Sequence, residues 1–509
     1  MKLNQLLISL FCTIALVLSS CSDDDKVSID ISQEYQDLTF EAPEERQTIQ
    51  ILANGDWHIK VPEDASWCTT SHKVGTGEQY VNISVDINNT NKDRNTQIVV
   101  SGKGSKETII NVTQHKNKIP VYAEAIEPDA TGMNIEMTSI ELSKAMKIGF
   151  NVGNTYEAIF VDDDGNCTGD ETVWGNIVPD ADLFRTIKAS GFNFVRMPLS
   201  FSHQLVDPKG GYEIKKEWFD KIAGSIDAAI EAGLYIKINI HWDGGWMDHV
   251  NDEHKDAIYE RFEAYWKQIA LRFRDYDDRL LFAGMNEVQD VERDLNNASL
   301  PDPDDENFRV HNNLNQKFIN IVRATGGRNY YRHLVVQSYA TNIDLAISKL
   351  KYPSDVVENR TFLEVHYYDP FEFCIKEKDY KLEWGRPFAA EGGDVPNWGL
   401  EDHMKETLYS LKKFTDKNIA VMIGEWGAPS RERDGIEGEA LARHLDSRNY
   451  YYWYMVKTCL QYDLLPVNWD IGFMIDRRTG ELLEADAIDA MMKAVDGEDY
   501  VFTTIQLDK

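Results

Sequence analysis

The feature that most constrains the fold is a repeated alternation of apolar runs and helix-like segments over the C-terminal two-thirds of the chain. Eight strand-like runs occur at 147–153, 192–199, 235–241, 280–286, 334–340, 361–368, 420–426 and 466–470. Between most of them, apolar residues recur at three- and four-residue spacing, as from Trp218 to Ile230, which predicts amphipathic helices. Eight such units over ~330 residues predict an α/β fold, a parallel (β/α)8 barrel. An open doubly wound sheet is the alternative, but no glycine-rich phosphate loop follows the first run.

The residues before the barrel have a different pattern. Short runs with alternating apolar positions, such as 47–51, 80–85 and 108–112, predict the half-buried strands of a small all-β, immunoglobulin-like sandwich. A chain of 509 residues also exceeds the ~250–300 residues that one core usually serves. We therefore predict four parts: a signal peptide at 1–20, the sandwich at 21–117, a connector at 118–137, and the barrel domain at 138–509, which opens with a capping box at Thr138 and Glu141.

The N-terminus predicts export and lipidation. Lys2 precedes an apolar stretch from Leu6 to Leu18, which is too short to span a membrane and suits a secretory signal. The residues ending in Cys21 resemble a bacterial lipobox, and the acidic residues after it resemble the export signal of Bacteroidetes surface lipoproteins. This resemblance implies a lipid on Cys21 that anchors the protein to the outer membrane, facing outward. A chance cysteine is the alternative.

Charge and cysteine spacing exclude several classes of protein. The formal net charge of −32 repels polyanions, so we expect no nucleic-acid partner. The cysteines beyond the signal segment, Cys68, Cys167, Cys374 and Cys459, show no C-x-x-C spacing, which argues against a disulfide framework or a zinc site. The acidic stretch 162–171 has its glycine misplaced for an EF-hand. We expect no metal and no cofactor, and a monomer.

Polar and aromatic residues gather where the predicted barrel strands end. Because the C-terminal ends of barrel strands converge on one rim, these side chains should meet. Each alone has a simpler structural explanation, but their joint occurrence points to one site. Two of them are glutamates, which could divide the work of cleaving a glycosidic bond. The set is Asn151, Arg196, His241, Asn286, Glu287, His366, Tyr368, Glu425 and Trp469.

The placement of Glu287 after the fourth strand and Glu425 at the seventh resembles glycoside hydrolase family 5 of clan A, subfamily 4. The supporting segments are 146–155, 171–176, 195–198, 240–246, 284–287, 365–370, 423–427 and 468–472. The first domain resembles the BACON domain through Trp57, 65–67, Gly75, Gly77, Arg94 and 112–114. Trp57 and Trp67 could stack on sugars, but core positions are favoured for both, so the sandwich is either a glycan-binding module or a spacer.

The family resemblance implies a role for each residue. Glu287 matches the acid/base, Glu425 the nucleophile, and Asn286 the residue that binds the sugar 2-hydroxyl. The remaining expected substrate-binding residues are Asn151, Arg196, His241, Trp246, His366, Tyr368 and Trp469. The resemblance implies a retaining mechanism with carboxyl groups ~5–5.5 Å apart. We expect neutral surroundings to raise the pKa of Glu287, and Arg196 and Tyr368 to keep Glu425 ionised.

Subfamily 4 resemblance implies an endo-β-1,4-glucanase, with xyloglucan as the expected polysaccharide substrate. Cellulose-like glucan, mixed-linkage glucan and mannan are alternatives, and a non-catalytic surface glycan-binding lipoprotein is the alternative from another class. Trp174, Trp242, Trp246, Trp384 and Trp398 lie in loop-like stretches and should present ring faces to the substrate. The sequence departs from the family pattern at Trp242, Ala283, Val288, Asn468 and Ile471, which leaves the substrate less constrained than the mechanism.

Overall fold

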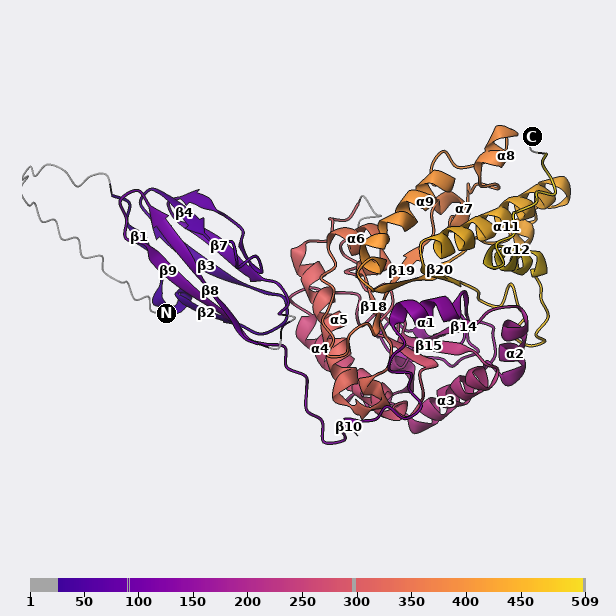
Figure 1. Ribbon diagram of the computed structural model, residues 1–509, viewed down its shortest axis with the longest axis horizontal. Helices are drawn as coiled ribbons and strands as arrows, with labels where there is room; N and C mark the ends of the chain where they lie inside the picture. Colours follow the sequence, from indigo (N-terminus) through magenta and orange to yellow (C-terminus); the bar gives the residue numbers. More distant parts are fainter. Residues whose placement is uncertain (1–25, 89, 91, 295–298, 507–509) are drawn as a thin grey trace, which may run out of the picture. The chain divides into compact units, whose positions relative to one another are not determined.

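The computed structural model describes residues 26–88, 90, 92–294 and 299–506. They form two compact units (Figure 1). The first contains Glu45–Asp86, Lys92–His115 and the chain before Ala42, and the second contains the chain from Lys116 onward with Ala42–Glu44 and Ile87–Asn91. The predicted signal peptide and Cys21 lie outside the described residues. Within the described ranges, no helix has the length and apolar character needed to cross a membrane.

The first unit is the expected all-β sandwich. One sheet has the order β1 (Ile29–Asp30), β3 (Glu45–Ala53), β7 (Gln79–Val85) and β5 (Cys68–Thr70). The other has the order β2 (Asp37–Phe40), β9 (Thr108–Gln114), β8 (Arg94–Gly102), β4 (Asp56–Lys60) and β6 (Val74–Thr76). Alternate side chains such as Val81, Ile83 and Val85 are fully buried, as period-two patterning requires.

Both tryptophans of the sandwich take part in its packing. Trp57 is 2% exposed, and its indole nitrogen donates a hydrogen bond to the carbonyl of Gly77 at 3.0 Å. Trp67 packs partly buried against the same core, with the guanidinium of Arg94 4.4 Å from its ring centroid. The preference for core positions is therefore confirmed for Trp57, while one face of Trp67 is covered by Arg94.

The second unit is built on the predicted closed parallel barrel. Its strands, in order around the barrel, are β11 (Gly149–Asn151), β14 (Phe194–Leu199), β15 (Tyr235–Ile240), β16 (Leu280–Ala283), β18 (Leu334–Gln337), β19 (Thr361–Tyr367), β20 (Ala420–Trp426) and β21 (Leu464–Asn468). Several are shorter than the apolar runs that predicted them. Asn286 and Glu287, for example, lie beyond β16, because at the rim the chain leaves the ladder to enter a loop.

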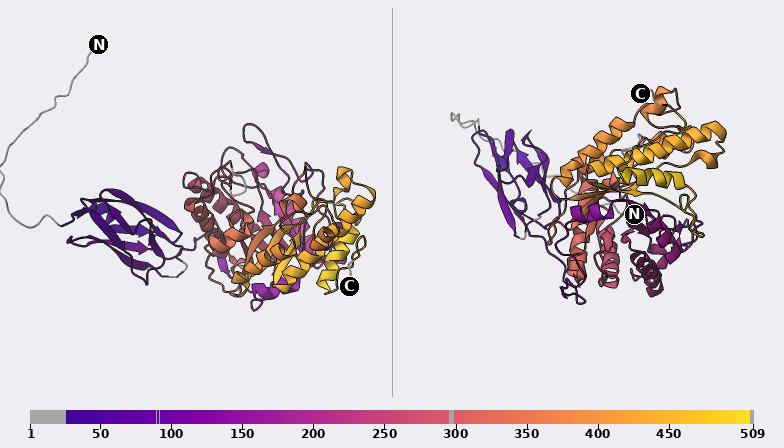
Figure 2. Two further views of the ribbon diagram at one scale, coloured as in Figure 1. Left: turned by 90° about the horizontal axis from the view of Figure 1, so that it is seen from above. Right: turned by 45° about the vertical axis from the view of Figure 1, so that its right-hand side comes forward.

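Helices pack around the outside of the strands (Figure 1, Figure 2). They are α2 (Ala181–Ala189), α3 (Lys216–Glu231), α4 (Lys255–Arg272), α5 (Asp305–Ala324), α6 (Ile343–Ser348), α7 (Phe371–Cys374), α8 (Arg386–Ala390), α9 (Glu401–Ser410), α10 (Lys412–Thr415), α11 (Gly438–Gln461) and α12 (Ala485–Val495). Helix α1 (Ser139–Met146) starts with the predicted capping box at Thr138. Its Leu142 and Met146 pack with Phe194 and Phe362 from inside the barrel. The lower half of the barrel is thus filled with apolar side chains, and polar chemistry is left to the upper rim.

The segment expected to be a connector belongs to the second unit. Tyr122 donates a hydrogen bond to Glu263 at 3.1 Å, and β10 (Ile126–Pro128) pairs with β17 (Gly326–Gly327). A short antiparallel pair, β12 (Phe160–Val161) and β13 (Cys167–Thr168), lies in the loop after the first barrel strand. The four cysteines within the described ranges are all free thiols.

Candidate active site

Three of the predicted residues meet at the centre of the rim. Glu287 follows β16, His366 lies near the end of β19, and Glu425 near the end of β20. One carboxylate oxygen of each glutamate and one ring nitrogen of His366 all lie within 4.8 Å of one another. The side chain of Glu287 is 46% exposed, whereas those of His366 and Glu425 are 4% and 7% exposed. The site therefore has one carboxylate open to solvent and one held in its floor.

Arg196 organises this floor from the second barrel strand. Its Nη1 donates hydrogen bonds to Oε1 of Glu425 at 2.7 Å and to Oδ1 of Asn151 at 2.9 Å, and its Nη2 donates to Oδ1 of Asn286. The amide of Asn151 in turn donates to the carbonyl of Gly424 at 2.9 Å. The bond from Arg196 fixes the amide of Asn286, leaving its nitrogen to donate elsewhere.

Two residues expected to contact substrate do not reach the surface. Asn151 and Arg196 are both 0% exposed, and their polar groups bond to the strand ends and to one another. The expectation that Asn151 and Arg196 contact substrate is corrected. Arg196 holds Glu425 and Asn286 in place from below, and Asn151 holds Arg196. Closing the barrel makes this contact possible, because the first strand, β11, pairs with both the second, β14, and the eighth, β21.

His366 and Glu287 are joined by a hydrogen bond. Nδ1 of His366 lies 2.7 Å from Oε1 of Glu287. Burial opposes a charge on the imidazole, but Glu425, Glu287 and Glu364 together raise the pKa of His366 to about 9. For Glu287, burial acts to raise the pKa, but the hydrogen bond and positive charge of His366 outweigh it and lower the pKa below its ordinary value.

The expected electrostatic surroundings of the two glutamates are therefore corrected. Glu287 faces the positive charge of His366 rather than neutral groups. The proton expected on Glu287 therefore lies on His366. Glu425 has its expected partners, Arg196 and the hydroxyl of Tyr368, which donates to Oε2 at 3.2 Å. Burial nevertheless raises the pKa of Glu425 above its ordinary value, since the positive charges of His366 and Arg196 only partly offset it.

The backbone at Glu287 has an unusual conformation. Its φ of 48° lies in the left-handed region, which non-glycine residues seldom occupy and which costs roughly 1–3 kcal/mol. The turn directs the carboxylate toward His366, and the hydroxyl of Thr341 lies 3.5 Å from the same oxygen. Strain of this kind persists where the surrounding structure holds a functional group in place.

An aromatic surface lies beside the carboxylates. The rings of His241 and Trp469 stack with an interplanar angle of 4° and centroids 6.0 Å apart. Gly153 makes room for the indole, since a Cβ there would lie 2.9 Å from it. Burial, together with the charges of Arg196 and His366, holds the pKa of His241 well below its usual range. A neutral imidazole and an indole face suit a sugar ring and its hydroxyls.

The tryptophans predicted to present ring faces divide into two groups. Trp174, Trp242 and Trp398 are 36%, 44% and 39% exposed. Trp384 is fully buried, which contradicts the expectation. Trp246 is partly exposed and packs edge-on against Tyr265, with the guanidinium of Arg261 over its ring at 4.8 Å, and its contact with substrate stays a prediction. Loop position alone does not reveal whether a neighbouring helix covers a ring.

The sequence reasoning missed two buried charges beneath the rim. Lys237 of β15 and Glu364 of β19 are both 0% exposed, and Nζ of Lys237 lies 2.5 Å from Oε1 of Glu364. The signal that could have revealed them was a charged residue in the middle of each apolar strand run. Charged side chains are seldom fully buried unless paired.

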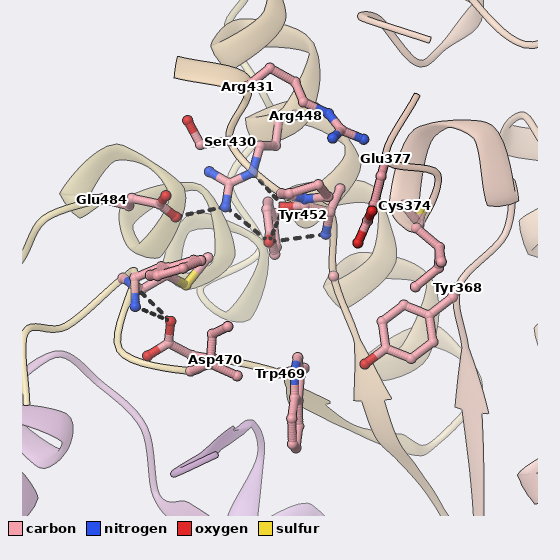
Figure 3. A pocket seen from close by; sticks show the side chains of 17 residues that line it. Tyr368, Cys374, Glu377, Ser430, Arg431, Arg448, Tyr452, Trp469, Asp470 and Glu484 are labelled. Carbon is pink, nitrogen blue, oxygen red and sulfur yellow. Dashed lines mark hydrogen bonds and ion pairs between the residues drawn. The ribbon is translucent and has the colours of Figure 1, made fainter. Parts of the chain in front are cut away.

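A pocket of about 340 Å³ opens beside the nucleophile candidate. Figure 3 shows Tyr368 and Trp469 on one side of it, with Tyr452 and the ion pair of Arg448 and Glu484 on the other. Arg448 donates to Glu484 at 2.6 Å. The remaining lining is mainly apolar. Size and composition fit a small-molecule subsite with a few polar groups.

Comparison with known proteins agrees with this geometry. Residues 154–474 match the model of the cellulase family, glycosyl hydrolase family 5. The chain belongs to glycoside hydrolase family 5. Residues 56–115 match the BACON family, described as a putative N-terminal binding domain. Both expected families are thereby confirmed, and the chain is a glycoside hydrolase.

Individual relatives of this family 5 enzyme are similar over most of its length. A xyloglucan-specific endo-β-1,4-glucanase from Bacteroides ovatus is 50% identical over 488 residues, covering 95% of each chain. A solved Bacteroides ovatus family 5 xyloglucanase in complex with a XXXG heptasaccharide has a TM-score of 0.73 at 50% identity, covering 92% of this chain and 100% of that one. A family 5 xyloglucanase from Paenibacillus pabuli has a TM-score of 0.62 at 29% identity, covering 70% and 99%.

Proposed function

We propose that the protein is a retaining endo-β-1,4-glucanase that cleaves xyloglucan, with Glu425 as nucleophile and Glu287 as acid/base. The observation that carries this proposal is the spacing of the two carboxylates, whose nearest oxygens lie within 4.8 Å. Retaining enzymes place their carboxyl groups roughly 5–5.5 Å apart, whereas inverting enzymes need roughly 6.5–9.5 Å to admit a water molecule. An upper limit of 4.8 Å between one oxygen of each glutamate is compatible with the retaining separation and supports direct attack by Glu425.

The contacts of each glutamate suit its proposed step. Glu425 forms a bond to the anomeric carbon while the bond from that carbon to the leaving oxygen breaks. The leaving oxygen takes a proton through Glu287 from the hydrogen-bonded Glu287–His366 pair. Water then attacks the anomeric carbon and returns a proton to that pair, and Glu425 departs as a carboxylate. Arg196 and Tyr368 stabilise the departing charge at 2.7 and 3.2 Å.

The preference for xyloglucan rests on two supports. The relative with 50% identity over 95% of the chain is named as xyloglucan-specific. The pocket beside Tyr368 and Trp469 adds space next to the reacting centre that a linear glucan does not need. A neutral polysaccharide also meets no repulsion from an enzyme with a net charge of −32.

We also propose that the enzyme is a lipoprotein of the outer cell surface, anchored through Cys21. This proposal rests on the lipobox-like sequence ending at Cys21 and the acidic residues that follow. Palmitate labelling of the wild type, with loss of label in Cys21→Ala, is the expected result. Equal labelling of both proteins would refute it, and protease accessibility on intact cells would test the outward orientation.

Hydrolysis assays test the substrate and the mechanism together. Release of oligosaccharides should be fastest from tamarind xyloglucan, compared with barley glucan, carboxymethylcellulose and mannan. Glu425→Ala and Glu287→Ala should each lose at least about 10³-fold in kcat on xyloglucan. NMR should show that the first product retains the β-configuration. Retained activity in Glu425→Ala would overturn the site, and a faster rate on an unbranched glucan would overturn the substrate preference.

Filling the pocket tests its contribution to specificity. Ser430 lines this pocket, so Ser430→Trp should lower kcat/KM on xyloglucan while leaving the rate on carboxymethylcellulose near that of the wild type. An equal loss on both substrates would show that the pocket does not distinguish branched from linear chains.

A further inference from the structure

A buried ion pair lies directly beneath the catalytic groups. Lys237 and Glu364 project into the barrel from β15 and β19, with no exposed side-chain surface. Oε1 of Glu364 lies 2.5 Å from Nζ of Lys237, 3.0 Å from Nε of Arg196 and 3.6 Å from Nε2 of His366. Its other oxygen accepts a hydrogen bond from Gln337 at 2.7 Å. One carboxylate thus contacts both the arginine that holds Glu425 and the histidine that holds Glu287.

The barrel makes specific room for this carboxylate. A Cβ built at Gly424 would lie 2.0 Å from Oε1 of Glu364. Gly424 immediately precedes Glu425 on β20, so a larger residue there would displace either Glu364 or the nucleophile candidate. The absence of a side chain at Gly424 is what lets the sixth and seventh strands bring the two carboxylates close together.

Charges of opposite sign balance around this centre. Three carboxylates face three groups that can carry a positive charge, and neutral His241 and Tyr368 complete the surroundings. Apart from Glu287, whose side chain is 46% exposed, these charged groups are buried, so each charge depends on its neighbours because an isolated charge in this interior would be costly. The charged groups are Glu287, Glu364, Glu425, Arg196, Lys237 and His366.

We propose that Lys237 and Glu364 are positioning residues that set the pH range in which the Glu287–His366 pair keeps its proton and Glu425 is ionised. They do so without touching substrate. This inference rests on the proposed roles of Glu287 and Glu425, and it adds a second layer of residues that controls their charges through Arg196 and His366.

The sign of each effect follows from the contacts. Glu364 faces Nε2 of His366 at 3.6 Å and favours its protonation, and its negative charge raises the pKa of Glu425. Removing that charge should let both groups lose protons at lower pH. Lys237 acts in the opposite direction on Glu425, because a nearby positive charge favours the carboxylate. Burial lowers the pKa of Lys237 to about 7, so this effect operates on the acidic side of neutrality.

The test is the pH dependence of kcat/KM on a xyloglucan oligosaccharide for Glu364→Gln, Lys237→Met and the double variant. Glu364→Gln should move both limbs of the profile to lower pH by about one unit. Lys237→Met should move the acidic limb to higher pH. The double variant, in which no unpaired charge is buried, should return the acidic limb close to the wild-type position.

A matched control separates charge effects from loss of stability. Asp355, in the loop before β19, forms a buried ion pair with Arg323 of α5 at 2.5 Å. Asp355→Asn should lower the melting temperature without moving either limb. If Glu364→Gln does not fold, Lys237→Met and the double variant decide the question. The inference would be overturned if the acidic limb of the pH profile stayed in place in Lys237→Met. It would also be overturned if the acidic limb shifted in the same direction in both single variants. Activity in Glu425→Ala would instead overturn the proposed function.

Discussion

Replacing Tyr368 with phenylalanine removes the hydroxyl that donates to Oε2 of Glu425 at 3.2 Å. Glu425 keeps its bond to Arg196 at 2.7 Å, so the nucleophile should stay in position while its charged form loses one donor. A group that hydrogen-bonds the charged form lowers the pKa of a carboxylate, and its removal therefore raises that pKa. The acidic limb of kcat/KM, which reports the free enzyme, should move to higher pH.

The size of the shift follows from the geometry. A hydrogen bond to a charged group contributes about 1.5–3 kcal/mol, and one pKa unit corresponds to about 1.4 kcal/mol. The expected rise in the pKa of Glu425 is therefore about 1–2 units. The distance of 3.2 Å is longer than the roughly 2.7–2.8 Å typical of hydroxyl donors, which places the expectation for Tyr368→Phe near about one unit.

The neighbouring residue provides a matched control. Tyr367 is 2% exposed, and its hydroxyl has no hydrogen-bond partner within the described part of the chain. Tyr367→Phe makes the same chemical change one residue away and should leave the acidic limb within about 0.2 units of the wild type. Initial rates on a soluble oligosaccharide from pH 4 to 9 measure both variants. An unmoved limb in Tyr368→Phe, or equal shifts in both variants, would refute the reasoning.

Three further predictions concern stability and packing. Trp57→Ala should destabilise the first unit of the full-length protein by about 3–5 kcal/mol in denaturant unfolding, with hydrolysis of soluble xyloglucan unchanged; an unchanged unfolding midpoint would contradict it. Gly424→Ala should lower kcat/KM at least about tenfold and reduce the melting temperature, because its Cβ would lie 2.0 Å from Glu364; wild-type rates would contradict it. Burial raises the pKa of Glu157 to about 7 from 4.5. The folded protein therefore binds this proton more tightly than the unfolded chain, which contributes about 3 kcal/mol of stability at low pH that is lost as the pH rises from 4.5 through 7. Glu157→Gln should therefore flatten the unfolding free energy between pH 4.5 and 7, and an unaltered slope would exclude this assignment.

The fold was predictable because its determinants are local. Alternating positions specified the strands of the sandwich, and helical spacing between apolar runs specified the barrel units. The meeting of Glu287, His366 and Glu425 was also predictable, since strand ends of a parallel barrel converge on one rim. Strand boundaries were less accurate, because the residues of interest leave the ladder to enter loops.

Burial and charge at the rim were not predictable from local pattern. Asn151 and Arg196 match a substrate-site motif yet lie under the floor, and Trp246 lies against Arg261 whereas Trp242 is exposed. The lowered pKa of Glu287 depends on His366, which lies 79 positions away in sequence. Such properties depend on distances across the barrel, which no periodicity encodes.

The sequence by itself determined the two domains, the barrel, and the two glutamates proposed to break the glycosidic bond, because residue type and spacing suffice for these. Only the tertiary structure decided where the proton rests and what lies beneath the site. Closing the barrel brings Nζ of Lys237 to 2.5 Å and Nε of Arg196 to 3.0 Å from Oε1 of Glu364, where none of the three side chains is exposed. At that distance each charge is set by its neighbours in space rather than by its neighbours in sequence.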